Sequence, residues 1–574
     1  KMMKKKVFAL IIAVLMLLTV FAGCTGDSGN DNPSTGPKPS QNQNESNSPD
    51  GPTEDEGPKE YEFAELTIGI PSRATIDSME APTNKFTAYF EENLNLKLNF
   101  MFFPADSTNY LRQLALMAST STEKMPDVLV GFSLGSNLRD DYGDAGFFVD
   151  LAKHMDQLPN MKKQFEKTDP NIMARLDAHM YSLSGAIYGA PLYFADSAVD
   201  DMENMMWVNQ DWLDKLGLKK PTTVKEFHDV LVAFRDNDCN GNNDKNDEYP
   251  CFGAMGPGGL LNYVINAFIY YDAGNPFDVI NGKPELVPIR DEYRNAMILL
   301  NQWYKEKLIP QISITATGAE RKATISPNSG VAKVGIWNGH PATQANQTSA
   351  VLDSYVYLDP LKAETDLGGY LPVAGKVMDF KTFITEDCEN LDAALRFVDF
   401  FFVDETISRG RHGVKDEDWY YELGTNIFGD ADAYVNCVDS SVFFEGNHTW
   451  GGNFAGYVTS QNYFAVENFK YHYDENIGRM LHEQIDVMNR SSQPESLVRE
   501  QIYTNEEYER LNDIRTPSHQ WITTWFTRFL TGEKNPASDA DWNEYIQGLE
   551  TYGLDEWVKL VQDIYKAQPD RVKH

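Results

Sequence analysis

Apolar residues recur along this chain at two spacings, and the change from one spacing to the other predicts its secondary structure. Within residues 66–131, short apolar runs at 66–70, 96–103 and 126–131 predict strands, and amphipathic stretches at 84–94 and 110–118 predict helices. The residues that share one face of the first helix are Phe86, Tyr89, Phe90 and Leu94. Strands that alternate with helices at this spacing predict a parallel, doubly wound sheet.

A second set of elements begins near residue 205. Residues 206–209 predict a strand, and residues 210–216 predict a short helix that ends at Gly217. Thr223 and Glu226 form a capping box, because each side chain can satisfy a free backbone N–H at the start of the next helix. The chain is therefore expected to cross into a second lobe here.

Further along, the helical spacing predicts helices at 293–306, 391–402, 520–530 and 555–566, and an apolar run predicts a strand at 333–337. In the third of these helices Trp521, Trp525 and Phe529 follow each other at four-residue steps. That spacing places the three rings on one face and favours core packing over ligand contact.

The N-terminus has the pattern of an export signal. Lys4, Lys5 and Lys6 precede an apolar run at 7–20, which is shorter than the roughly 20 residues a membrane span needs. Small residues then precede Cys24, which predicts a lipoprotein signal at 1–23 and lipidation of Cys24; the alternative is a plain secretory signal. Residues 24–60 are polar and predict a disordered tether, because such a segment buries too little apolar surface to fold.

Charge and cysteine content limit the partners and the chemistry. The net charge of −35 disfavours nucleic acid and anionic lipid as partners, since both are themselves negative. Besides Cys24 the chain has four cysteines, without CxxC or metal-ligand spacing. A disulfide between Cys239 and Cys251 and free thiols are both compatible with the sequence.

The sharpest local motif is an Asp- and Asn-rich stretch at 236–248. Counted from Asp236, oxygen-bearing side chains occupy positions 1, 3, 5 and 9, glycine occupies position 6 and an acid position 12, which is the spacing of a calcium loop. An acidic surface turn is the alternative. The predicted structural Ca²⁺ ligands are Asp236, Asp238, Asn240, the Asn242 carbonyl, Asp244, Asp247 and Glu248.

Several motifs in this order resemble one protein family. They include the run from Trp207 to Gly217, the residues around Pro221 and Thr223, the stretches at 126–128, 146–151, 187–191 and 333–336, and a C-terminal region at 542–556. The chain resembles the extracellular solute-binding lipoproteins of ABC sugar importers, and among them the large oligosaccharide-binding subgroup. No single stretch is specific, but their order is.

The resemblance implies a two-lobed α/β clamp of type II, each lobe a doubly wound sheet flanked by helices, with extra C-terminal helices. We expect the first lobe at 61–203 and 373–435, and the second at 204–372 and 436–574. Hinges would lie at 193–205 and 371–375. A monomer anchored by its lipid alone would pass an oligosaccharide to permease subunits, and the calcium would be structural.

Sugar rings present apolar faces and a rim of hydroxyls, so a sugar site needs aromatic rings and planar polar groups. Trp337 and Trp450 stand among Gly, Asn and His residues, which permit close approach and hydrogen bonding. Arg73 follows the first strand, where α/β sheets place ligand loops. The predicted ligand-binding residues are Trp337, Trp450, Tyr193, Arg73, Asn338 and His340.

An extracellular glycoside hydrolase is the alternative from another functional class. It needs two carboxylates about 5–9.5 Å apart, and 85 acidic residues leave that possible. However, the sequence has no HExxH, GxSxG or Walker A motif. A binding protein without catalysis is therefore expected, with either a neutral or a uronate sugar as ligand.

Overall fold

A computed structural model of the chain describes residues 61–120, 124–168, 173, 176–177, 179–194, 206–256, 259–339, 350–363, 367–370, 378–424, 433–437, 446–458, 479–480, 483, 501 and 503–571. The expected export signal, the tether with Cys24, most of the crossing at 193–205, the crossing at 371–375 and His340 lie outside these residues.

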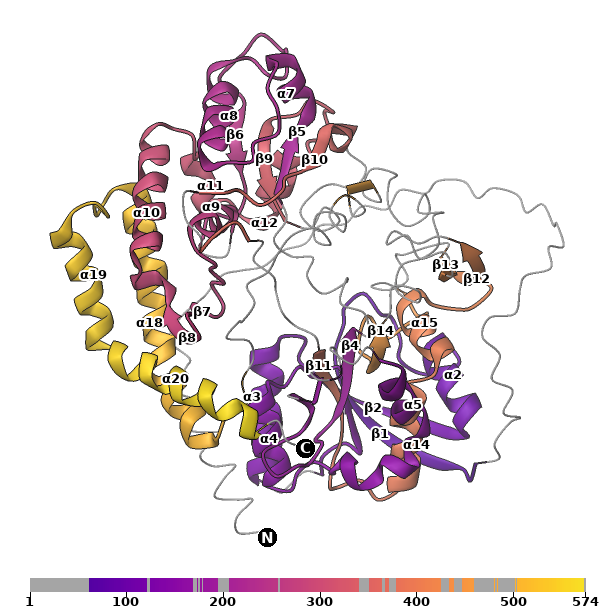
Figure 1. The fold of residues 1–574 in the computed structure, drawn as a ribbon. Coiled ribbons are helices and arrows are strands. Elements are labelled where there is room, and N and C mark those ends of the chain that lie inside the picture. Colours follow the sequence, from indigo (N-terminus) through magenta and orange to yellow (C-terminus); the bar gives the residue numbers. More distant parts are fainter. Residues whose placement is uncertain are drawn as a thin grey trace, which may run out of the picture.

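The chain folds into two lobes, drawn one above the other in Figure 1, and each lobe has its own apolar core. One core gathers buried residues from 64–193, 380–407 and 450–457. The other gathers buried residues from 206–361 and from the C-terminal helices. This is the two-lobed, type II α/β clamp that the resemblance predicts.

The first lobe is built on a six-stranded sheet with the order β14-β4-β11-β3-β1-β2. Strand β1 pairs in parallel with β2 and β3, whereas β11 is antiparallel to both of its neighbours. The predicted strands at 66–70, 96–103 and 126–131 are confirmed. The strands are β1 (Ala64–Pro71), β2 (Leu96–Phe103), β3 (Val128–Val130), β4 (Ala190–Phe194), β11 (Met378–Ile384) and β14 (Gly456–Val458).

Helices flank this sheet, and their ends follow local capping chemistry. The helix α2 begins because the Asn84 side chain accepts hydrogen bonds from two free N–H groups, and it ends at Asn95 in the left-handed region. The helices of the lobe are α2 (Lys85–Leu94), α3 (Ser107–Thr120), α4 (Ser136–Asp144), η1 (Leu151–Gln157), α5 (Pro159–Lys167), α14 (Leu391–Phe400) and α15 (Asp404–His412).

One expected boundary between the lobes is wrong. The segment from 436 onward was assigned to the second lobe, but β14 pairs with β4 in the sheet of the first. Trp450, Phe454 and Tyr457 are buried in the core of the first lobe. The return of the chain to the first lobe therefore extends at least to Val458, because long-range strand pairing leaves no local sequence signal.

The second lobe contains a four-stranded sheet with the order β10-β5-β9-β6. β5 matches its predicted bounds, and β9 includes most of the predicted strand at 333–337. The strands are β5 (Met206–Asn209), β6 (Tyr249–Phe252), β9 (Val334–Asn338) and β10 (Tyr355–Tyr357), together with a separate hairpin of β7 (Phe277–Ile280) and β8 (Lys283–Leu286).

The capping box predicted from Thr223 and Glu226 is present at the start of α8. Gly217 ends α7 in the left-handed region, as predicted. The helices are α7 (Gln210–Leu216), α8 (Val224–Asp236), α9 (Leu260–Phe268), η2 (Val287–Ile289), α10 (Asp291–Lys305), α11 (Gln311–Thr315), α12 (Gly318–Ile325) and η3 (Ala350–Ser354).

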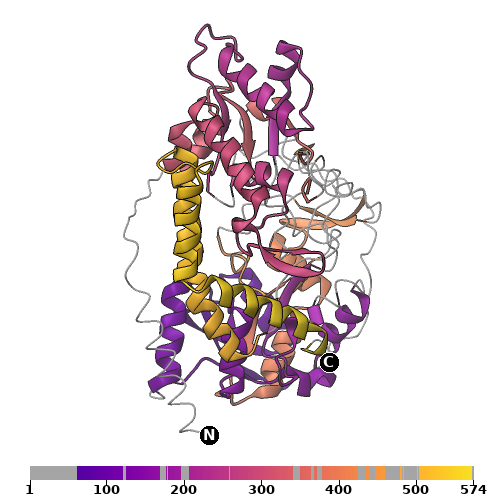
Figure 2. The ribbon, with the colours of Figure 1, turned by 60° about the vertical axis from the view of Figure 1, so that its left-hand side comes forward.

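Three C-terminal helices complete the second lobe: α18 (Asn505–Thr531), α19 (Asp539–Thr551) and α20 (Leu554–Arg571). α18 is much longer than the predicted helix at 520–530, because it begins at the capping box of Thr504 and continues through Pro517. It packs along α10 and also contacts α4 of the first lobe. Figure 2 shows α18 in yellow running from the second lobe toward the first.

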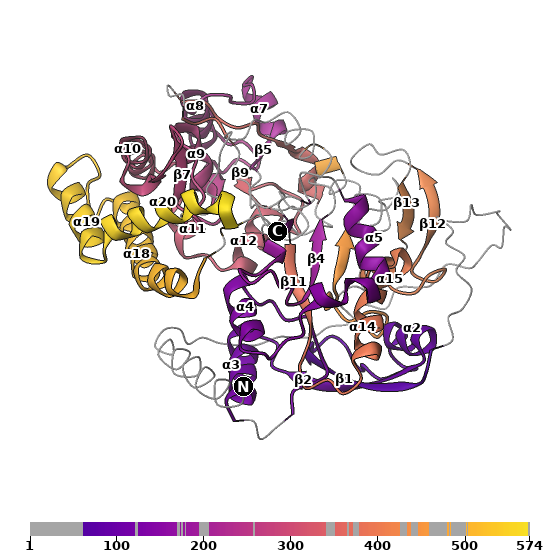
Figure 3. The same cartoon turned by 60° about the horizontal axis from the view of Figure 1, so that its bottom comes forward.

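Figure 3 shows a small hairpin of β12 (Trp419–Gly424) and β13 (Ala433–Cys437) beyond α15 of the first lobe.

Cys239, Cys251 and Cys388 are free thiols, so the structure does not contain the disulfide considered between Cys239 and Cys251. Within the described ranges, no helix combines the length and the apolar character that crossing a bilayer requires.

Candidate functional site

The carboxyl ends of the first-lobe strands lie at one edge of the sheet, and a loop from far along the chain covers them. Gly446 N–H donates to the Thr75 carbonyl at 2.9 Å, and Lys85 N–H donates to the Asn447 carbonyl at 2.7 Å. The Asn447 side chain also accepts from Ser78 N–H at 2.9 Å. We call residues 446–453 the covering loop. It brings Trp450 to the edge where Arg73 lies.

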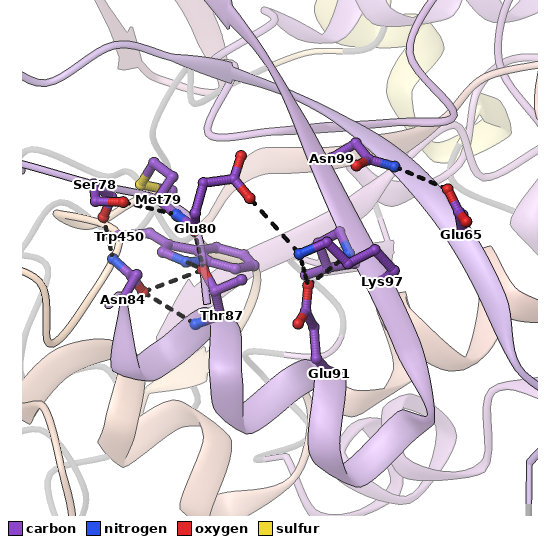
Figure 4. A network of polar contacts seen from close by, with 11 residues as sticks. Glu65, Ser78, Met79, Glu80, Asn84, Thr87, Glu91, Lys97, Asn99 and Trp450 are labelled. Atoms are coloured by element: carbon purple, nitrogen blue, oxygen red, sulfur yellow. Dashed lines mark hydrogen bonds and ion pairs between the residues drawn. The ribbon is translucent and has the colours of Figure 1, made fainter. Parts of the chain in front are cut away.

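Trp450 is 1% exposed and lies inside the aromatic core below the covering loop. Its ring stacks on Phe90, with centroids 5.2 Å apart and planes 23° apart. Its indole N–H donates to Thr87 Oγ1 at 2.9 Å, and Thr87 in turn donates to the Met79 carbonyl (Figure 4). In this conformation the ring has no face free for a sugar, so its ligand contact stays a prediction.

Arg73 is exposed and follows β1, as the sequence predicted. Its side chain passes over Gly451, where a Cβ would lie 2.9 Å from the Arg73 Cδ. Gly451 also has a φ of +62°, so a larger residue is disfavoured there on both grounds. No ion pair of the Arg73 guanidinium is found within the described part of the chain.

Tyr193 lies at the end of β4 and is fully buried. Its hydroxyl shares a 2.9 Å hydrogen bond with the Thr168 hydroxyl, and burial raises the Tyr193 pKa. The Tyr193 ring packs near Phe165 and Tyr457. In this conformation Tyr193 supports the sheet from within, and its contact with a ligand stays a prediction.

In the second lobe, Trp337 and Asn338 end β9. Trp337 is fully buried and stacks on Trp207, with centroids 5.7 Å apart. The half-buried Asn338 has a buried Oδ1 atom without a hydrogen-bond partner in the described residues. That atom lies where a Cβ on Gly253 would be only 2.2 Å away. The amide of Asn338 therefore has unused hydrogen-bonding capacity at the end of the strand.

A polar cluster near the carboxyl end of β3 was missed by the sequence reasoning. Lys381 Nζ lies 2.8 Å from Asp379 Oδ2 and 2.6 Å from Ser133 Oγ. The Ser133 hydroxyl also donates to Asp379 Oδ2 at 2.8 Å. Opposite charges two residues apart in a strand are only a weak sequence signal for a polar site. Ser133 comes close to Asp379 and Lys381 only because β11 pairs with β3.

The predicted calcium loop is held by its own side chains. The Asp238 carboxylate accepts from Gly241 N–H at 2.7 Å and from Asn243 N–H at 2.9 Å. Gly241 and Asn243 both have positive φ angles, 78° and 70°. Asp247 contacts the side-chain amide of Asn242 at 2.9 Å. The loop therefore has the sharp turns that a calcium loop requires.

Two members of the predicted ligand set differ in their surroundings. Asp236 is paired with Arg235 through two contacts of 2.7 and 2.9 Å, which occupies both of its carboxylate oxygens. Glu248 is 8% exposed and accepts from Cys239 N–H through Oε1, while Oε2 is buried without a hydrogen-bond partner among the described residues. Burial raises the Glu248 pKa, and the charge of Asp247 contributes to the rise.

Another group of possible metal ligands lies in the first lobe. In the described part of the chain, Glu417, Asp418 and His448 bring their carboxylate and imidazole atoms within 4.8 Å of one another. His448 Nδ1 lies 2.6 Å from Asp418 Oδ2. If both atoms bound one tetrahedral metal ion, each about 2.0–2.2 Å from it, the distance between the two atoms would be larger than 2.6 Å. The contact is therefore a hydrogen bond that joins the covering loop to the segment after α15.

Comparisons with known proteins agree with this architecture. The fructooligosaccharide ABC transporter substrate-binding protein FusA of Streptococcus pneumoniae is 27% identical over 211 residues, which are 36% of this chain and 38% of FusA. Lipoprotein LipO of Bacillus subtilis is 30% identical over 171 residues, which are 29% of this chain and 30% of LipO. The matched residues thus span well under two thirds of either relative.

Solved structures of S. pneumoniae FusA, one with kestose and one of an EF-hand mutant with fructo-nystose, have TM-scores of 0.68 and 0.67. Each is 18% identical, and each comparison covers 88% of this chain and 99% of that one. These likenesses show the fold. The model of the family described as "bacterial extracellular solute-binding protein" matches residues 74–406, more than half of the sequence. The chain belongs to this family of extracellular solute-binding proteins.

Proposed function

We propose that this protein captures an oligosaccharide between its two lobes and delivers it, chemically unchanged, to the permease of an ABC importer. The observation that carries the proposal is the course of the chain between the lobes. β4 is parallel to β14 and ends at Phe194, on the edge of the sheet where Arg73 lies. β5 begins at Met206, which pairs with Asn338 at the end of β9.

The edge at which the chain leaves the first lobe thus carries Arg73, and the edge at which it enters the second carries Asn338. Residues 195–205 separate these edges, and an extended chain of that length spans at most about 40 Å. Ligands of open α/β sheets bind at the carboxyl ends of the strands. A sugar held between these edges would contact both lobes, so its binding would favour a closed arrangement.

Arg73 and Asn338 are the predicted contacts whose polar groups lack a partner among the described residues. Arg73 donates through an exposed planar guanidinium. The Asn338 Oδ1 atom is an unpartnered acceptor but is buried, so it can bind a sugar hydroxyl only when the groups that cover it rearrange. Trp337, Trp450, Tyr193 and His340 remain predicted contacts. For the three buried rings among them, contact requires the segments that cover each ring to rearrange.

The test is calorimetric titration of the full-length chain, in detergent micelles, with kestose, maltotriose and trigalacturonate. Sugar chromatography before and after the titration separates binding from hydrolysis. Arg73→Ala and Asn338→Ala should each weaken binding by about 1–3 kcal/mol, the cost of a lost hydrogen bond to a buried or charged partner. Arg112→Ala, which removes an exposed arginine of α3, should leave binding unchanged. Degraded sugar, or no binding of any probe, would contradict the proposal.

We further propose that the loop at 238–248 binds a structural Ca²⁺, and that the ligand set starts at Asp238. The predicted ligands that follow supply hard oxygen donors, which calcium prefers: Asp238, Asn240, Asn242, Asp244, Asp247 and Glu248. The unpartnered Glu248 Oε2 fits such an ion, because a buried carboxylate oxygen without a hydrogen bond is otherwise costly. Asp236 is left out because Arg235 occupies its carboxylate.

Chelation should lower the melting temperature of the protein by about 5–10 °C, since a bound ion stabilises only the folded state. Glu248→Gln should abolish this chelator effect and weaken Ca²⁺ binding in calorimetry. Asp236→Asn is the matched control and should bind Ca²⁺ as the unmodified protein does. Equal losses in both variants would place Asp236 back in the ligand set.

The export signal and Cys24 support a location outside the cytoplasmic membrane, anchored by lipid. Radiolabelled palmitate should label the protein, and Cys24→Ala should lose the label and appear in the culture medium. A labelled Cys24→Ala protein would reject the anchor.

A further inference from the structure

The cluster of Ser133, Asp379 and Lys381 lies at the edge of the sheet where the parallel strands end, and some of its hydrogen-bonding groups have no partner among the described residues. A purely structural role needs neither property. β11 runs antiparallel to β3, with Thr382 opposite Val130. Gly131 N–H donates to the Lys381 carbonyl at 2.7 Å, so β11 continues past the end of β3. The start of β11 therefore lies at the edge where the parallel strands end.

Asp379 and Lys381 flank Phe380 in β11, whose register with β4 shifts between Phe380 and Thr382. Their charged groups meet at 2.8 Å, whereas Phe380 is buried against the Arg139 guanidinium. The Lys381 and Asp379 side chains are 21% and 28% exposed. The cluster is thus partly covered by protein and partly open to a ligand.

The hydrogen-bond count leaves one donor and one acceptor free. The Lys381 ammonium has three N–H groups, of which two are directed at Ser133 Oγ and Asp379 Oδ2. The Asp379 carboxylate uses Oδ2 for both of its contacts, and no partner of Oδ1 is found in the described part of the chain. A spare N–H and a spare carboxylate oxygen side by side match two neighbouring sugar hydroxyls, of which one accepts and the other donates.

Charge adds a second restriction. The ammonium and the carboxylate neutralise each other at 2.8 Å, so the cluster presents no net charge to a ligand. A sugar carboxylate placed here would approach Asp379, which repels it, whereas a hydroxyl pair meets a matched donor and acceptor.

We propose that Ser133, Asp379 and Lys381 form a subsite that binds a pair of hydroxyls of a neutral sugar ring and disfavours a uronate. This inference rests on the proposed sugar-binding function and narrows its substrate class. Asp379 and Lys381 contact the sugar, and Ser133 positions them, because its hydroxyl lies within hydrogen-bonding distance of both.

The experiment measures the affinity of the full-length chain, in detergent micelles, for kestose, maltotriose and trigalacturonate. The unmodified protein should bind a neutral probe more tightly than trigalacturonate. Asp379→Asn keeps the shape but removes the negative charge. It should weaken binding of the neutral probe about tenfold or more and tighten binding of trigalacturonate, because Lys381 is then uncompensated. Ser133→Ala should weaken neutral-sugar binding less and leave the preference for a neutral sugar intact.

Glu91→Gln is the matched control. It removes a carboxylate from the ion pair with Lys97 in the same lobe, 3.1 Å apart, which lies between α2 and β2 (Figure 4). It should change neither affinity. Melting temperatures of all variants show whether each one folds, and Ser133→Ala, the smallest change, keeps the test valid if Asp379→Asn does not fold.

Three results would overturn the inference. If the unmodified protein binds a neutral sugar and neither Asp379→Asn nor Ser133→Ala alters that affinity, the cluster only supports the fold, and the proposed function stands. If the unmodified protein prefers trigalacturonate, the substrate class is wrong. If it binds none of the three probes, the proposed function fails as well.

Discussion

At the scale of single residues, the predicted site residues differ in burial. Trp337, Trp450 and Tyr193 were predicted as sugar contacts because of their local sequence, yet all three are at most 1% exposed. Glycine-rich neighbours indicate that a ligand can approach the backbone closely, but they do not indicate whether an aromatic ring points toward the ligand or into the core. Arg73, just after β1, is exposed, whereas the Asn338 Oδ1 atom at the end of β9 is buried without a partner among the described residues.

Asp278 gives a prediction at this scale. It is 5% exposed on β7, opposite Glu285, and burial raises the pKa of Asp278 to about 6. An unfolded Asp titrates near 3.9, so the folded state holds this proton more tightly. The resulting stability is fully present below about pH 4 and is lost as pH rises through 6.

Asp278→Asn should therefore stabilise the protein at pH 7 by about 1–3 kcal/mol and leave its stability at pH 4 nearly unchanged. Urea unfolding at both pH values measures the effect. Asp291→Asn, at the start of the neighbouring α10, removes a charge of the same sign from a more exposed position and serves as the control. A stability gain of equal size at pH 4 would show that the change acts through packing and not through the charge.

At the scale of elements, local signals predicted a subset of the helices. The capping box of Thr223 begins α8 as expected, because capping involves residues three positions apart, and the helix predicted at 84–94 begins at the cap of Asn84. α18 is longer than the predicted helix at 520–530 and continues through Pro517, although proline is disfavoured inside a helix. Packing of α18 along α10 holds the helix together on both sides of this proline.

The far end of α18 is also held by α10. The Asn301 side-chain amide donates to the carbonyls of Phe529 and Leu530, at 2.8 and 3.3 Å, in the last turn of a helix that ends at Thr531. Asn301→Ala should remove the donor of the Leu530 carbonyl, leave the Phe529 carbonyl with the Gly532 N–H at 3.3 Å, and cost about 1–3 kcal/mol of stability. Thermal unfolding measures this cost.

Gln302→Ala is the control for that prediction, because Gln302 is the next residue of α10 but is exposed and bonds only within its own helix. It should change stability by less than about 0.5 kcal/mol. Equal losses in the two variants would mean that helix propensity in α10, and not the cap on α18, determines the result.

At the scale of the whole molecule, two separate cores predict two cooperative units. The first-lobe core and the second-lobe core share no residues, and the described contacts between lobes include α18 with α4. Scanning calorimetry of the protein without sugar should therefore show two overlapping transitions. A bound sugar that contacts both lobes should raise both transitions and bring them together.

Trp450→Phe should shift only the first-lobe transition, because the smaller ring leaves a cavity in that core and the hydrogen bond to Thr87 is lost. The expected loss is about 1–3 kcal/mol. Trp303→Phe is the matched change in the second core, where Trp303 is 1% exposed, and it should shift only the other transition. A single transition that moves equally in both variants would show that the lobes unfold as one unit.

The sequence by itself determined features that depend on neighbours along the chain: the first three strands of the first lobe with two of their helices, the capping box of Thr223 and Glu226, and the sharp turns of the loop at 236–248. The sequence also predicted the two-lobed clamp, because its motifs follow one another in the same order as in the family that it resembles. Only the tertiary structure decided which residues meet across the sheet: β14 beside β4, and Ser133 beside Lys381. The reason is physical, because capping and periodicity act over a few residues, whereas burial and strand pairing join residues hundreds of positions apart.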